Sequence, residues 1–148
     1  MSDDYPIDHF PRPLILRPIE NGRRWLLFEP FDFVDGVDCV HVPAGFVSDL
    51  NSVPRVLWWW MPKTEYAEAG LVHDFCYRYP GKRNREQVDQ IHRRILELFG
   101  VRKSKRNAAY YGIRIGSGST WNRYRADEFA LRKQLIELQE KARRKEQV

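Results

Sequence analysis

The stretch Tyr66-Ala-Glu-Ala-Gly-Leu-Val-His-Asp-Phe-Cys-Tyr77 is expected to form the central helix of this protein. Its apolar residues recur at helical spacing, and Tyr79-Pro80-Gly81 supplies a stop signal. His73 and Tyr77 are four residues apart and therefore share one helical face. Asp74 adjoins the histidine in this apolar helix, where titratable groups are costly unless partners satisfy them. The His73–Asp74 pair is therefore the first candidate site.

Length and composition predict one domain with an ordinary core, since 43% of the 148 residues are hydrophobic. The net charge of +5 permits contact with phosphates, but the charges are too mixed to predict specific nucleic-acid binding. The first residues lack the features of a signal peptide, and no apolar run reaches transmembrane length. We therefore expect reduced cysteines, although pairing of Cys39 with Cys76 stays open.

Two hairpin signals predict a small antiparallel sheet in the N-terminal third. Asn21-Gly22 and Asp35-Gly36 are favoured hairpin dipeptides, and each lies between apolar runs. Four strands are expected from these runs. Residues 1–12 are mostly polar and predict an extended arm ahead of the sheet.

Helical patterns follow the sheet. Asn84, with Gln87 three residues later, predicts a capping box that starts a second helix carrying Asp89. The short turn before it makes this helix an antiparallel neighbour of the first. A third helix is expected over residues 104–115, and a last one from about Trp121.

These elements predict an α+β fold, with a small N-terminal antiparallel β-sheet followed by a bundle of three or four helices. The single domain spans residues 13–138. The charged residues 139–148 lack apolar spacing and are expected to form a frayed tail.

Several carboxylates can gather around His73. Asp89 can reach the imidazole from the second helix, and a histidine oriented by a carboxylate can act as a general base on water. Tyr77 lies on the same face as the histidine. Asp74 and Asp49 are candidates to hold a hard divalent cation such as calcium through oxygen ligands.

Each residue also has a structural interpretation, which the sequence leaves open. Asp49 can be a helix N-cap, Asp89 can pair with Arg93, and Tyr77 can belong to the core. Arg55 can stack on a tryptophan or bind an acidic group. The coincidence of these groups around one histidine favours a functional site over any of the single roles.

A series of motifs runs from about Phe31 to Trp121. Its members are Gly45-Phe-Val-Ser-Asp-Leu-Asn-Ser-Val-Pro-Arg55, a Trp-rich stretch, Val72-His-Asp-Phe-Cys-Tyr-Arg78, Arg85, Asp89, Gly100-Val101, Arg106, Tyr110 and Arg114. The series resembles an uncharacterised phage and prophage family, the domain of unknown function thirteen-fifty-three. The resemblance implies a phage-encoded protein, and it implies no particular reaction.

A shorter pattern, Ala69-x-x-x-His73-Asp74-x-x-Tyr77 with the later Asp89, is similar to the catalytic helices of phospholipase A-two. The compact form on parvoviral capsid proteins has the nearest spacing. This resemblance implies that His73 is the base, that Asp74 binds calcium, and that Tyr77 and Asp89 orient the histidine. The glycine-rich calcium loop of that family has no counterpart here, and Asp49 would have to replace its oxygens.

The leading hypothesis is a phage-encoded protein with a hydrolase-like His/Asp site. One version of this hypothesis is a metal-assisted, phospholipase-like activity. The alternative is a non-catalytic virion structural or assembly protein in which the cluster stabilises the fold. The corresponding partners are membrane phospholipid or other virion proteins, in the host cytoplasm during infection or in the virion. An open cleft at the cluster would favour the enzyme, whereas a buried and saturated cluster would favour assembly.

Overall fold

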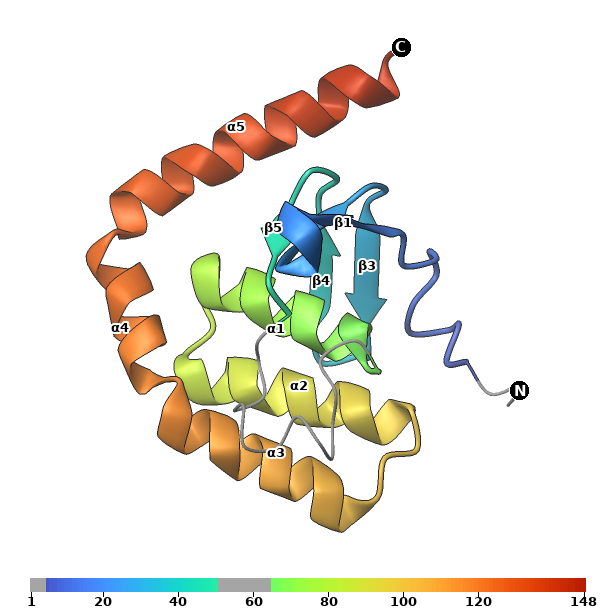
Figure 1. The fold of residues 1–148 in the computed structure, drawn as a ribbon, viewed down its shortest axis with the longest axis vertical. Coiled ribbons are helices and arrows are strands. Elements are labelled where there is room, and N and C mark those ends of the chain that lie inside the picture. Colours follow the sequence, from blue (N-terminus) through green and yellow to red (C-terminus); the bar gives the residue numbers. More distant parts are fainter. Residues whose placement is uncertain (1–4, 51–64) are drawn as a thin grey trace.

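The computed structural model describes residues 5–50 and 65–148, and Figure 1 shows their arrangement. The strands within these residues are β1 (Leu16–Ile19), β2 (Arg24–Leu27), β3 (Phe31–Val34), β4 (Cys39–Val42) and β5 (Val47–Ser48). All of their pairings are antiparallel. They form a three-stranded sheet of order β1-β2-β5 and a separate β3-β4 pair.

Both predicted hairpins are confirmed. Asn21 and Gly22 adopt positive φ angles of 58° and 79° between β1 and β2, as the dipeptide signal requires. The strand arrangement differs from the expected single four-stranded sheet, because β5 completes the first sheet. Pro30 stands between β2 and β3 and cannot donate to a ladder, which separates the second hairpin from the first sheet.

The helices of the described chain are α1 (Ala67–Arg78), α2 (Arg85–Leu98), α3 (Lys103–Gly116), α4 (Gly118–Ala126) and α5 (Glu128–Glu146). The predicted central helix is α1. The capping box of α2 is confirmed, since the Asn84 side chain accepts from the Gln87 amide at 2.8 Å and Gln87 Oε1 accepts from the Asn84 amide at 2.9 Å. The α+β fold is confirmed, with five helices in place of three or four.

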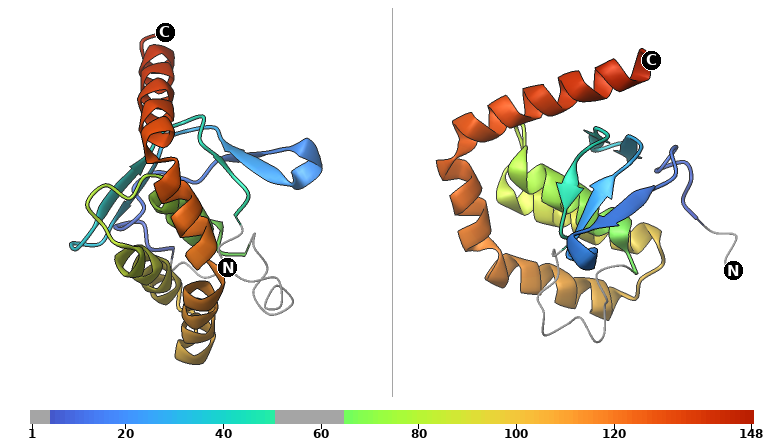
Figure 2. Two further views of the ribbon diagram at one scale, coloured as in Figure 1. Left: turned by 90° about the vertical axis from the view of Figure 1, so that its left-hand side faces the viewer. Right: turned by 45° about the horizontal axis from the view of Figure 1, so that its top comes forward.

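The extra helix arises after Gly116. The expected last helix is divided into α4 and α5, which meet at Asp127. Ser117 alone separates α3 from α4, so the predicted break there acts as a bend in a nearly continuous helical path. Figures 1 and 2 show α3, α4 and α5 following one another around one side of the molecule.

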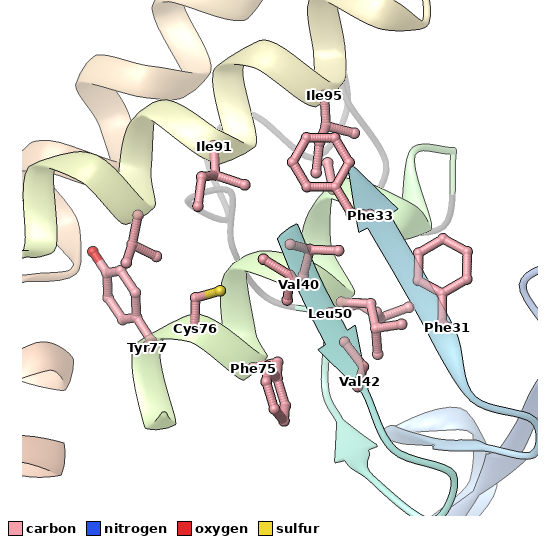
Figure 3. Close-up of a cluster of buried hydrophobic side chains, with 14 of the residues drawn as sticks. Phe31, Phe33, Val40, Val42, Leu50, Phe75, Cys76, Tyr77, Ile91 and Ile95 are labelled. Carbon is pink, nitrogen blue, oxygen red and sulfur yellow. The ribbon is translucent and has the colours of Figure 1, made fainter. Parts of the chain in front are cut away.

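The core lies between the β3-β4 hairpin, α1 and α2 (Figure 3). Phe31, Phe33, Val40 and Val42 alternate along the two strands and are all buried. Each such side chain contributes about 1.5–3 kcal/mol by leaving water. Because α1 is covered by the hairpin on one side and by α2 on the other, most of its residues are buried, including His73.

The described part of the N-terminal arm is anchored to this core. Phe10 is 1% exposed, and its ring stacks at 5.5 Å on Phe31 and at 5.6 Å on Phe99. At the other end of the chain, α5 continues through residues 139–146, so the segment expected to fray is helical as far as Glu146. Its small contribution to the fold stays a prediction. Among the helices of the described residues, none combines the length and the apolar composition of a membrane span.

Candidate active site

The site is built where α1 and α2 lie side by side. His73 and Tyr77 project from one face of α1, and the short turn after Tyr79 brings α2 back beside them. Asp89, on the first turns of α2, is fully buried against this face. The predicted antiparallel contact between the two helices is therefore confirmed.

Asp89 binds three side chains. Its Oδ1 lies 2.8 Å from His73 Nε2 and accepts a hydrogen bond from the Tyr77 hydroxyl at 2.7 Å. Its Oδ2 accepts from Arg114 Nη1 at 2.8 Å. The predicted His73–Asp89 contact is thus present, and Arg114 takes the place of Arg93, which bonds instead to Gln90.

These contacts keep the Asp89 carboxylate charged. Burial alone would raise the pKa of Asp89, but the hydrogen bond and charge of His73, with the hydrogen bonds of Tyr77 and Arg114, outweigh it and lower the pKa. A charged carboxylate only accepts hydrogen bonds, so Nε2 of His73 carries a proton. In the neutral ring, the lone pair then lies on Nδ1.

A second arginine braces the pair from α2. Arg85 Nε donates to the Tyr77 hydroxyl at 3.3 Å and lies 3.9 Å from Asp89 Oδ2. Its Nη2 donates to the carbonyl oxygens of Ile113 and Arg114 at the end of α3. Arg85 and Arg114 therefore fix the position of α3 relative to the His73–Asp89 pair.

His92 completes the buried face of α2. It lies three residues after Asp89, and its ring meets the His73 ring edge-on with centroids 5.4 Å apart. Burial, followed by repulsion from His73, lowers the pKa of His92 to about 3 against a weaker opposing effect of Asp89. His92 Nδ1 is buried without a hydrogen-bond partner. This ring is therefore neutral at ordinary pH, and it packs edge-on against the ring of His73.

A cavity of about 160 Å³ opens beside the pair. Asp49 lines it, and the other lining side chains come from α1 and from the region where α4 begins: His73, Asp74, Tyr77, Ser117, Thr120, Arg123 and Tyr124. His73 thus bonds to Asp89 through Nε2 and also borders a cavity.

The two residues predicted to bind a metal both line this cavity. Asp74 Oδ1 lies 3.6 Å from Arg78 Nε, while Asp74 Oδ2 is buried without a hydrogen-bond partner. Burial raises the pKa of Asp74, and the opposing charge of Arg78 does not cancel this effect. Within residues 5–50 and 65–148, no three His, Cys, Asp or Glu side chains form a group that could hold a metal ion. Calcium binding by Asp74 and Asp49 stays a prediction.

Arg55 lies outside the described residues, so its predicted roles are untested. The sequence did not predict the cavity wall formed by Ser117, Thr120 and Arg123. No pattern marks these residues, because α4 has no clear apolar stripe and none of its residues is buried.

The family model described as a protein of unknown function, DUF1353, matches residues 25–113, which is more than half of the chain. The chain belongs to the DUF1353 family. No curated protein and no solved structure matches it. The DUF1353 match includes His73, Tyr77 and Asp89, and it ends one residue before Arg114. The cavity wall from Ser117 onward lies beyond the matched residues.

Proposed function

We propose that this DUF1353 protein is a hydrolase in which His73 is the general base. The observation that carries the proposal is the position of His73, which bonds to the buried, charged Asp89 through Nε2 and also lines the cavity. The hydrogen bond to Asp89 holds the imidazole in one tautomer, in which Nδ1 is the basic nitrogen.

The proposed reaction begins with a water molecule in the cavity. Nδ1 of His73 takes a proton from this water as the water oxygen attacks the ester centre of the substrate. The same proton then passes from His73 to the leaving oxygen. Asp89 stabilises the imidazolium that forms between the two steps, and Tyr77 and Arg114 hold Asp89 in place.

The test compares wild type with His73→Ala and His73→Gln on a panel of phospholipid and phosphodiester substrates. Glutamine can still donate to Asp89 but has no basic nitrogen, so it separates the loss of a base from the loss of a buried contact. We expect at least a ~100-fold loss of rate in both variants. His41→Gln is the matched control, since His41 lies on β4 and its side chain is 53% exposed.

The second candidate function is a non-catalytic virion or assembly role. The complete burial of Asp89 and its bonds to three side chains favour this candidate, because such a network also stabilises a fold. An inactive wild type that binds no divalent ion, together with a strongly destabilised His73→Gln, would support it against the hydrolase. A phage origin is supported by the motif series and is shared by both candidates.

A metal-assisted, phospholipase-like reaction is tested separately, by calcium binding. Calcium would have to bind at Asp74 and Asp49, so calorimetric titration of wild type and Asp74→Asn distinguishes it from hydrolysis by His73 alone. We expect any calcium affinity to disappear in Asp74→Asn, because the variant loses a carboxylate ligand. Calcium binding that persists unchanged would place the ion elsewhere.

A further inference from the structure

We infer that the substrate of this site carries an anionic oxygen group, a phosphate or a carboxylate, which is bound by Arg123. That the bound molecule is a substrate rests on the proposed function. The anion site itself can be tested without any activity. Arg123 lines the same cavity as His73, on the wall formed by α4.

The guanidinium of Arg123 is available for a ligand. Its Cζ lies 5.4 Å from the centroid of the Tyr124 ring, a cation–π contact that leaves the hydrogen-bond donors of the guanidinium unused. None of the described acids forms an ion pair with it. Most other arginines around the site are already occupied. Arg114 is bound to Asp89. Arg125 donates through Nη2 to the carbonyl oxygens of Tyr77 and Arg78, and it is not among the residues that line the cavity.

Two hydroxyl groups lie on the same wall. Ser117 and Thr120 line the cavity, and neither hydroxyl makes a hydrogen bond to a described residue. An arginine with two adjacent hydroxyls presents several hydrogen-bond donors to one small anion, for which a planar guanidinium is well suited. At about 160 Å³ the cavity is smaller than the few-hundred Å³ sites that hold drug-sized ligands, so it fits a group of few heavy atoms.

The acidic residues of the cavity limit where an anion can sit. These residues are Asp49 and Asp74, and neither belongs to α4. Asp74 lies on the α1 wall, where Arg78 lies beside its carboxylate and burial raises its pKa, which weakens its repulsion of an anion. An anion is therefore favoured on the α4 wall, next to Arg123. The rest of the ligand then extends toward His73.

The test is binding of inorganic phosphate and of acetate, followed by NMR at fixed ionic strength. We expect saturable phosphate or acetate binding with shifts at the amides of residues 117–123 and at the His73 ring. Arg123→Gln should weaken binding at least tenfold. Arg132→Gln is the matched control, because Arg132 is an exposed arginine on α5 paired with Glu128 and away from this cavity.

Each outcome separates the inference from the proposed function. Absence of binding by both anions, or equal weakening in Arg123→Gln and Arg132→Gln, would overturn the anion site. Binding that depends on Arg123 in a protein without hydrolase activity would retain the anion site and refute the hydrolase. Equal hydrolysis of neutral and anionic esters, unaffected by Arg123→Gln, would retain His73 as base and refute Arg123 as the specificity residue.

Discussion

Mild acid should destabilise this protein through His92. The pKa of His92 is lowered to about 3 in the folded protein, whereas an unfolded chain protonates the same group near its ordinary value of 6.5. Between these two values the unfolded state binds more protons, so stability falls as the pH drops below 6.5. Each pH unit is worth about 1.4 kcal/mol, and acidification to about pH 4.5 should therefore remove roughly 3 kcal/mol.

The assay is urea unfolding followed by tryptophan fluorescence from about pH 7.5 to about pH 4.5. His92→Phe keeps a flat ring but cannot take up a proton, so its stability should lose this acid dependence. His92→Gln serves as a second non-titrating variant, and His41→Gln, at an exposed histidine, should keep the wild-type slope. The decisive quantity is the difference between wild type and the His92 variants, since other buried acids titrate in all of them. A difference of less than about 1 kcal/mol over this range in both His92 variants would refute the reasoning.

Three further outcomes are expected. Asp74→Asn should raise the melting temperature at neutral pH, because burial raises the pKa of Asp74 and its charged form is costly. The difference in melting temperature should vanish in acid, once the wild-type carboxyl is protonated. Phe10→Ala should cost about 3–5 kcal/mol in urea unfolding, because its ring is buried between Phe31 and Phe99. A chain ending at Glu140 should melt within about 3 °C of the full chain by calorimetry, and a larger loss would show that the end of α5 docks on the body.

The central contact of the site could be predicted because it depends only on local rules. Helical spacing places His73 and Tyr77 on one face, and the short turn before the Asn84 cap makes α2 antiparallel to α1. Asp89 then has to lie opposite that face. The same local rules gave both hairpins and the boundaries of α1.

The partners from α3 and α4 depend on tertiary packing. Arg114 is 25 residues from Asp89, and its contact requires the rotation of α3 about its own axis, which no local pattern specifies. Its place in the family motif series was the one available signal. The separate α4, with Arg123 on its cavity side, was missed because Gly116 and Gly118 predicted a break where the chain only bends.

The single carboxylate of Asp89 joins three helices, and this has a consequence for how the molecule opens. Asp89 on α2 is bound by side chains of α1 and α3. If either of those helices moves away, the buried charge of Asp89 loses hydrogen-bond donors that compensate it. Local opening of α3 alone is therefore unfavourable. In amide hydrogen exchange, the slowest amides of α1, α2 and α3 should therefore exchange together, as one cooperative unit. The outer turns of α5 should exchange faster and independently of that unit.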